Sequence, residues 1–247
     1  MTALQIEVHP DTDGVSRAVA NRMAGAILRR LSTHAEAHIC LTGGRGGQGA
    51  LASLARDTGI AWDRVHVWWS DERFVPRGDQ RRNDTMAHTV LLDVVGLPAA
   101  NVHAMPASDQ FEQVADAAQA YADELAAFGE PGPVFCISIL GMGEDGHVAS
   151  LFPEHPGLQE TRPAFPVRDS PKPPPVRISM SFDTINAADE VVLIAAGAAK
   201  ADAVGLLIND AGPSALPAAG VHGRSLTVLV VDESAAVHLP PGVTRRS

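Results

Sequence analysis

The sequence has little cysteine, little positive charge and no long apolar run. Its only cysteines, Cys40 and Cys136, each lie in an apolar segment. This favours core packing, because a disulfide framework or a metal site needs more ligands at closer spacing. No stretch reaches the roughly 18 apolar residues that cross a bilayer, and no basic segment followed by an apolar one opens the chain. We therefore expect a cytoplasmic protein with no metal ion and no membrane association.

Positive charge is scarce enough to exclude one class of partner. Acidic residues outnumber basic ones 29 to 19, which gives a net charge of -10. No run of lysine or arginine forms a basic stripe, so nucleic acid is not an expected partner. If the substrate is an anion, a few placed cations must overcome the negative mean field. Individual arginines and lysines near loops are therefore informative.

What the sequence does contain is an alternation of β-rich runs with longer helical patterns. This alternation predicts an α/β fold, namely one domain over residues 1–247 built on an open, doubly wound, mainly parallel sheet with helices on both faces, a Rossmann-like arrangement. Seven sheet strands are expected, over residues 4–8, 37–42, 64–70, 133–141, 176–182, 190–197 and 225–232.

Helices are expected over residues 15–34, 49–59, 84–96, 109–129 and 198–210. Asp11 and Asp13 are candidate N-caps of the first helix. Residues 161–177, which include six prolines, read as an extended surface loop rather than a domain linker, since strands are expected on both sides.

Three loops leave the predicted strands where ligands bind in open α/β sheets, beyond the carboxyl ends. In "LTGGRGGQG" the glycines, Gly43 and Gly44 among them, can aim N–H groups at a phosphate, although a plain flexible turn reads the same way. The loop lacks the Walker A and dinucleotide fingerprints, so no nucleotide cofactor is expected. In "SDERFVP", Arg73 can present its planar fork to an anion beside Asp71, or the charges simply end a strand in solvent.

The third loop, "GMGEDGH", carries Asp145 and His147. A carboxylate can orient an imidazole for proton transfer near neutral pH. Alternatively, Asp145 caps a helix that starts before "HVASLF". Lys200, at the start of a helix after a strand, and Arg177, at the head of another strand, can meet an anion or lie solvated.

Together these loops are similar to the signatures of one enzyme family. "SDERFVP", "GMGEDGHVASLFP" and "VVLIAAGAAKADAV" resemble the 6-phosphogluconolactonases, within the larger group that includes glucosamine-6-phosphate deaminases. The resemblance covers nearly the whole chain and implies hydrolysis of 6-phosphoglucono-1,5-lactone in the oxidative pentose phosphate pathway, without metal or organic cofactor. It implies that His147 is the general base and that Asp145 holds it. We expect phosphate and ring contacts from Gly43, Gly44, Arg45, Asp71, Arg73, Arg177 and Lys200.

The sequence departs from the family pattern at two places. The first loop commonly reads Gly-Gly-Ser-Thr-Pro, but here Arg45 replaces a small hydroxyl residue. A Ser-Asn pair after the second loop is here Arg82 and Asn83. Either Arg45 or Arg82 supplies an extra phosphate contact, or the phosphate pocket is rearranged.

Two other functions stay open. A deaminase-isomerase acting on an amino sugar phosphate needs a carboxylate base at C2, a role that Asp71 can fill. A non-enzymatic sugar-phosphate sensor normally carries a separate DNA-binding segment, but the first strand is expected within five residues of the start and no basic helix follows. The sequence carries no signature of an oligomeric state.

Overall fold

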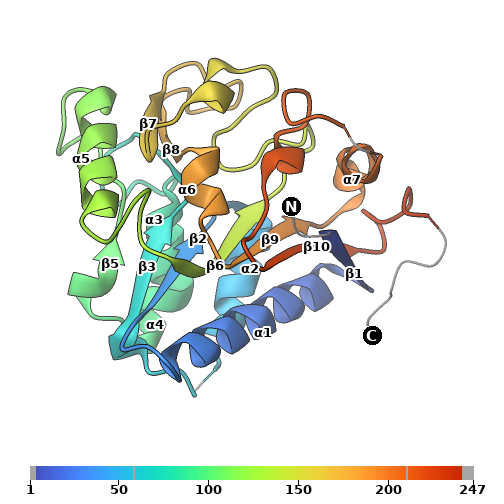
Figure 1. The fold of residues 1–247 in the computed structure, drawn as a ribbon, viewed down its shortest axis with the longest axis horizontal. Helices are drawn as coiled ribbons and strands as arrows, with labels where there is room; N and C mark the ends of the chain where they lie inside the picture. The colour runs from blue at the N-terminus through green and yellow to red at the C-terminus, as the bar shows by residue number, and fades with distance from the viewer. Residues whose placement is uncertain (1–3, 58, 210, 241–247) are drawn as a thin grey trace.

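The computed structural model describes residues 4–57, 59–209 and 211–240. Seven parallel strands form one sheet in the order β1-β10-β9-β6-β2-β3-β5 (Figure 1). The strands are β1 (Leu4–His9), β2 (Ala37–Leu41), β3 (Val65–Trp69), β5 (Val102–His103), β6 (Phe135–Gly141), β9 (Glu190–Ala195) and β10 (Leu226–Asp232). The predicted α/β class with a mainly parallel, doubly wound sheet is confirmed. The ends of the predicted domain, residues 1–3 and 241–247, lie outside the described residues.

Helices cover both faces of this sheet. On one face lie α1 (Thr12–Leu31), α2 (Gly44–Leu54), α3 (Asn83–Ala87) and α4 (Asp93–Val95); on the other lie α5 (Val114–Ala126), α6 (Phe182–Asn186) and α7 (Ala201–Ile208) (Figure 1). A π-helical segment over 88–92 joins α3 to α4. Asp11 caps α1 by accepting a 2.7 Å hydrogen bond from the Gly14 N–H, so one of the two proposed caps is confirmed. With both faces covered, β2 is buried along its whole length and β6 along all of it except Gly141.

The predicted strand at 176–182 was assigned to the wrong sheet. Within it, β8 (Arg177–Met180) pairs antiparallel with β4 (Asp71–Arg73) and with β7 (Ala164–Val167), and the three form a separate small sheet. The seventh place in the main sheet belongs to the two-residue strand β5. Every residue of β8 is buried, so its sequence indicates a buried strand but does not indicate which strands it pairs with. The presumed surface loop 161–177 also contributes β7 to this sheet.

Helix α2 begins at Gly44, five residues before the predicted start at 49. The low helix propensity of glycine hid this first turn, because "GGRGG" reads as a loop in isolation. The correction moves the helix N-terminus to the end of β2. The N–H groups of that first turn therefore lie at the carboxyl edge of the sheet, where they can meet an anion.

The strand order reverses beside β2. The chain continues from β2 to β3 and β5 on one side, whereas β6 lies on its other side and leads on to β9 and β10. A crevice forms beyond the carboxyl ends of the strands at such a reversal, and it is the usual ligand site of a doubly wound sheet. The exits of β2 and β6 are therefore the segments to inspect for chemistry.

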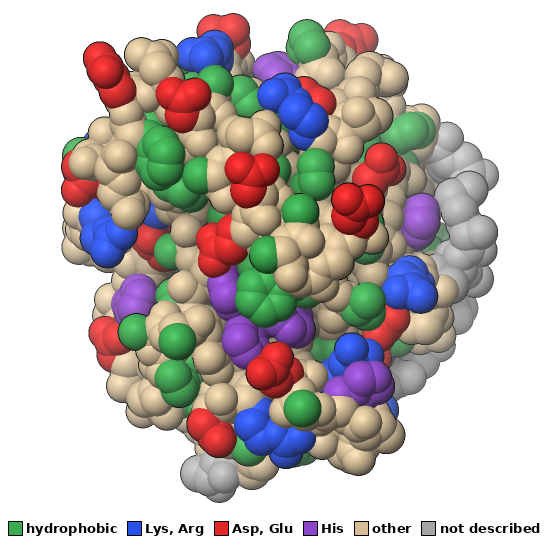
Figure 2. Space-filling model, turned by 60° about the vertical axis from the view of Figure 1, so that its left-hand side comes forward, with side chains coloured by type: hydrophobic (Ala, Val, Ile, Leu, Met, Phe, Trp, Pro, Cys, Tyr) green, Lys and Arg blue, Asp and Glu red, His purple; other side chains and the backbone are tan. Residues whose placement is uncertain are grey.

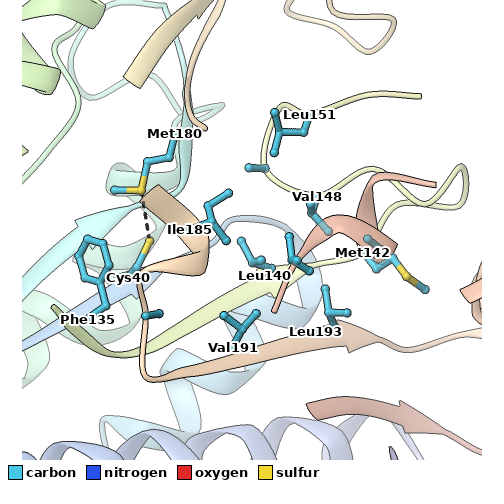
Figure 3. Packing of buried hydrophobic residues seen from close by; sticks show 14 of the residues in the cluster. Cys40, Phe135, Leu140, Met142, Val148, Leu151, Met180, Ile185, Val191 and Leu193 are labelled. Atoms are coloured by element: carbon cyan, nitrogen blue, oxygen red, sulfur yellow. Dashed lines mark hydrogen bonds between the residues drawn. The ribbon is translucent and has the colours of Figure 1, made fainter. Parts of the chain in front are cut away.

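An apolar core beneath this crevice fixes the loop that follows β6 (Figure 3). Val148 and Leu151 of that loop pack in the same cluster as Leu140, Met180 and Ile185. Burying several aliphatic side chains at about 1.5–3 kcal/mol each holds the backbone of the loop in place. The polar residues of the same loop are thereby presented to the crevice from a rigid base.

Both cysteines are free and buried. The Cys40 thiol lies 4.0 Å from the Met180 sulfur in the same core (Figure 3). Burial raises the pKa of each thiol to about 12. The cysteines are therefore packing residues, in agreement with the sequence-based expectation.

Within the part of the chain that the structure describes, no helix is both long enough and apolar enough to pass through a bilayer.

Candidate active site

A cavity of about 330 Å³ opens at the strand reversal, among the exits of β2, β6 and β9 and the start of β4. Eight of the nine residues predicted from the sequence line it: Gly43, Gly44, Arg45, Asp71, Arg73, His147, Arg177 and Lys200. The ninth, Asp145, contacts His147 directly. The tertiary structure thus brings five sequence segments to one site.

Asp145 and His147 form the central pair. The Asp145 Oδ1 lies 2.5 Å from the His147 Nδ1, and the imidazole ring rests 4.8 Å from the ring of Phe152. A carboxylate only accepts hydrogen bonds, so Nδ1 carries the proton and Nε2 is left with a lone pair. No described hydrogen bond engages Nε2. The pair therefore presents a free basic nitrogen to the cavity.

A tight glycine turn creates the pair. The Gly143 N–H donates to the His147 carbonyl at 2.8 Å, and the Gly146 N–H donates to the Gly143 carbonyl at 3.1 Å. A Cβ on Gly143 would lie 1.9 Å from the His147 Nδ1, and Gly146 has a φ of 75°. Only glycine lets the two side chains close over the backbone here. The alternative that Asp145 caps a helix is wrong, because residues 148–151 form a turn.

Asp145 stays ionised in this setting. Burial alone raises the pKa of a carboxyl group, but the hydrogen bond and charge of His147, together with those of Lys172, hold the pKa of Asp145 well below its usual range. The aspartate therefore remains an acceptor across the working pH range and keeps the proton on Nδ1.

Lys172 is the site residue that the sequence reading missed. Its Nζ lies 3.2 Å from the Asp145 Oδ1 and 3.1 Å from the His147 Nδ1. It comes from the proline-rich segment, which was expected to run over the surface. The available signal was a lysine amid "SPKPPP", where prolines restrict the backbone and can aim one side chain.

Asp71 bonds to residues from three other segments around the cavity. Its Oδ2 accepts a 2.7 Å hydrogen bond from the Ser150 hydroxyl and lies 3.7 Å from the Arg177 Nη1. The Asn83 amide donates to the Asp71 carbonyl at 2.9 Å and to its Oδ1 at 3.3 Å. The carboxylate is buried and both of its oxygens have partners. Asp71 is therefore placed as a connecting residue between three segments.

Arg177 lines the cavity, but most of its donors are used elsewhere. Its Nε donates to the Pro174 carbonyl at 3.1 Å, and its Nη2 donates to the Lys172 carbonyl at 2.8 Å. Nη1 faces Asp71 and lies 3.5 Å from the Ser150 hydroxyl. The guanidinium thus clamps the proline-rich segment onto the site.

Three other cations keep donors for a ligand. Arg45 is exposed on the first turn of α2. Lys200 is half-buried; burial lowers its pKa, and the positive charges of Lys172 and Arg45 add to this against the opposing pull of Glu144. Arg73 binds the Arg81 carbonyl through Nη1, and its buried Nε has no partner among the described residues. Clustered cations that repel one another are suited to an anion.

Arg82 does not take part in this cation cluster. It is 2% exposed, pairs with Asp84 at 2.7 Å and donates to the Met105 carbonyl at 2.7 Å. The alternative in which Arg82 contacts phosphate is therefore wrong. Its neighbour Asn83 does line the cavity, against Gly43, where a Cβ would lie 1.8 Å from the Asn83 Oδ1.

Among the described residues, no group of three or more histidine, cysteine or acidic side chains is arranged to hold a metal ion.

Comparison with known proteins gives a consistent relationship. The family model described as glucosamine-6-phosphate isomerases/6-phosphogluconolactonase matches residues 10–230. A 6-phosphogluconolactonase of Streptomyces coelicolor is 47% identical over 96% of this chain and 95% of its own length. One of Mycobacterium tuberculosis is 44% identical over 95% of this chain and 98% of its own length.

Solved structures agree with the sequence relatives. A 6-phosphogluconolactonase from Thermotoga maritima has a TM-score of 0.84 at 27% identity, covering 94% of this chain and 100% of that one. A monomeric glucosamine-6-phosphate deaminase has a TM-score of 0.79 at 18% identity, which shows a shared fold.

Proposed function

The chain belongs to the family of glucosamine-6-phosphate isomerases and 6-phosphogluconolactonases, and from this we propose that it hydrolyses the lactone ring of 6-phosphoglucono-1,5-lactone to 6-phosphogluconate, in the oxidative pentose phosphate pathway. Its relatives that are over 40% identical along nearly their full length carry the lactonase name. The observation that carries the mechanism is the His147 imidazole, held through Nδ1 by Asp145 at the cavity wall with Nε2 uncommitted.

The proposed reaction starts with a water molecule between His147 Nε2 and the lactone carbonyl carbon. His147 takes a proton from the water as its oxygen bonds to that carbon, and the carbonyl oxygen becomes an oxyanion. When the intermediate collapses, the bond from that carbon to the ring oxygen breaks. The ring oxygen leaves with the proton held by His147, and the product is an open-chain acid. A lactone is an activated ester, so no covalent nucleophile is required.

The phosphate is anchored by the cations that line the same cavity, Arg45, Lys200 and Arg73. Arg45 and Lys200 lie close enough to influence each other, and Arg45 belongs to the first turn of α2, whose N–H groups point toward an anion. The Nε of Arg73 has no partner among the described residues, so it can donate to the sugar ring or to the phosphate. This assignment explains how an enzyme with net charge -10 can bind an anionic substrate.

The engagement of Asp71 favours hydrolysis over the deaminase-isomerase reaction. A base that abstracts a proton from C2 of an amino sugar must present a free carboxylate oxygen to it. Both oxygens of Asp71 are held by Ser150, Asn83 and Arg177. No comparable observation favours a sugar-phosphate sensor. We extend the proposal to a cytoplasmic location, since a phosphorylated substrate does not cross a bilayer readily.

The test is the rate of acid release from freshly generated 6-phosphogluconolactone, with the unphosphorylated lactone measured beside it and spontaneous hydrolysis subtracted. We expect strong acceleration of the phosphorylated lactone only. Equal acceleration of both lactones would remove the proposed phosphate site. If neither is accelerated, the lactonase assignment falls, and ammonia release from glucosamine 6-phosphate becomes the next measurement.

A further inference from the structure

We propose that Lys172 is a positioning residue that offsets the negative charge of Asp145 beside His147, so that the imidazole stays available as a base. The inference rests on the lactonase function proposed above and adds to it a role for the proline-rich segment. The chain contains only two lysines, Lys172 and Lys200; the fold brings Lys200 to the wall of the cavity and Lys172 to the Asp145–His147 pair.

The geometry gives Lys172 a place beside the pair rather than beside the substrate. Its Nζ lies 3.2 Å from the Asp145 Oδ1 and 3.1 Å from the His147 Nδ1. Because Nδ1 already carries a proton toward Asp145, the ammonium group donates to the carboxylate and meets the imidazole as a neighbouring charge. The carboxylate is thus shared between two positive partners.

Without Lys172, the pair would work against its own function. An ionised aspartate at 2.5 Å favours the imidazolium form, which cannot take a proton from water. A positive charge at about the same distance opposes that preference, because two adjacent cations repel. Lys172 therefore lets Asp145 orient the imidazole while cancelling part of the carboxylate charge.

The position of Lys172 is built by the surrounding segment. The Ser170 hydroxyl donates to the Lys172 carbonyl at 2.8 Å, and the Ser170 N–H donates to the Pro175 carbonyl at 3.0 Å, which closes a turn around the lysine. Arg177 binds the same Lys172 carbonyl from the protein side. A lysine on a free surface loop would lose several rotamers to reach the pair, whereas this backbone is already placed.

Other charges around the pair cannot replace Lys172. Besides Asp145 and Lys172, the charged groups near the imidazole are Glu144, Lys200, Arg45, Arg73, Asp71 and Arg177. Arg177 is neutralised by Asp71, and Lys200 and Arg45 are assigned to the phosphate. No hydrogen bond from these residues to the pair is found in the described part of the chain.

The experiment compares the same substitution at the two lysines. Lys172→Met removes the charge but keeps the length of the side chain, Lys172→Arg keeps the charge, and Lys200→Met is the matched control. The full pH profile of kcat/KM for 6-phosphogluconolactone is measured for each variant, with the spontaneous rate subtracted at every pH. A thermal melt of each variant checks that the fold is retained.

For Lys172→Met we expect the acidic limb of the profile to move to higher pH by about one unit, as befits a neighbouring charge that is partly screened because the Lys172 side chain is 42% exposed. At pH values below the limb, kcat/KM then falls about tenfold, mostly through kcat. Lys172→Arg retains the wild-type limb. Lys200→Met raises KM and moves the limb much less.

Two outcomes would overturn the inference while leaving the lactonase function intact. One is a Lys172→Met variant with the wild-type pH profile. The other is a raised KM for the phosphorylated lactone with an unmoved acidic limb, which would make Lys172 a phosphate ligand. Absence of turnover in the wild-type protein would instead reject the proposed function itself, so the two failures are distinguishable.

Discussion

Histidines occupy two contrasting regions of this molecule. His147 lies on a glycine turn beyond the carboxyl end of β6, beside a carboxylate and an ammonium group, and faces a cavity. His38, His66 and His103 instead belong to β2, β3 and β5 and lie on the face of the sheet that α5 covers. We call these three side chains, together with Trp68, the histidine stack.

The histidine stack is held by ring contacts. The Trp68 and His103 rings stack at 3.9 Å, the His38 and His66 rings at 4.7 Å, and Phe128 meets them edge-on. Figure 2 shows histidine side chains gathered on this face of the molecule. The rings also bond to one another, with His66 Nδ1 and His103 Nε2 2.9 Å apart. His103 Nδ1 also lies 2.7 Å from the Glu124 Oε1, and none of the three histidines lines the cavity that His147 faces.

His147 and the histidine stack differ in their surroundings rather than in residue type. At His147 a carboxylate and a cation fix one nitrogen and free the other. In the histidine stack, burial is the main cause that lowers the pKa of His38 to about 4, and it also lowers the pKa of His66. Burial among rings thus disfavours the charged form of His38 and His66, whereas His147 keeps one ring nitrogen uncommitted beside a cavity.

The largest effect is expected at His147, the proposed general base. Replacing His147 by alanine should lower kcat by roughly 10² or more with KM nearly kept, which is the usual loss for a general base. The control change His66→Gln should leave kcat within about twofold, since the His66 ring lies outside the cavity. Steady-state acid release measures both. Near-normal turnover by His147→Ala would remove it from the mechanism.

A smaller effect is expected at the cations that line the cavity together with His147. Arg45→Ala should raise KM for the phosphorylated lactone about tenfold and leave the unphosphorylated lactone unaffected, because a charge-assisted contact of about 1.5 kcal/mol is lost. Arg56→Ala, at an exposed position beyond the end of α2, is the control. An unchanged KM would show that Arg73 and Lys200 bind the phosphate without Arg45.

The smallest expected effect concerns the stability of the histidine stack in acid. Burial, with the charges of His66, His103 and Arg30, lowers the pKa of His38 to about 4. An unfolded histidine titrates near pH 6.5, so between pH 6.5 and 4 the unfolded chain binds a proton that the folded chain refuses. The free energy of unfolding should therefore fall on acidification by about 1–3 kcal/mol through His38, with Glu36 and Glu124 moderating the loss.

Thermal melts at pH 7.5 and pH 5 check this effect. His38→Gln keeps an acceptor for the Trp68 indole N–H, which donates to His38 Nδ1 at 3.1 Å, but it has no proton to gain. The drop in Tm between the two pH values should be smaller in the variant by several degrees, at about 2–4 °C per kcal/mol for a chain of this size. An equal drop in both proteins would place the acid sensitivity elsewhere.

Most of the fold could be read from local patterns. Apolar runs located six of the seven main-sheet strands, and Asp11 was one of two candidate caps for α1, which begins at Thr12, three residues before the expected start at 15. The two-residue strand β5 is too short to give a pattern, and the glycines of α2 concealed its first turn. The partner of β8 was misassigned, since a buried strand looks the same in either sheet.

Within the candidate site, the sequence indicated residues next to strand exits. His147 and Asp145 stand two positions apart on a glycine turn, so their contact follows from local geometry. Lys172 could not be found in this way, because it reaches His147 from 25 positions further along the chain. In the sequence, Arg82 and Arg177 were likewise indistinguishable from anion ligands, because their buried partners come from tertiary contacts.

The sequence by itself determined the α/β class, the turn that pairs Asp145 with His147, and the loops that meet at the carboxyl edge of the sheet. These follow from periodicity, glycine and strand polarity, which are local properties of the chain. Tertiary structure alone decided which cations stay open to a ligand, that Arg177 clamps the proline-rich segment, and that Lys172 joins the catalytic pair. Charge pairing depends on distances between segments far apart in sequence, and only the packed core sets those distances.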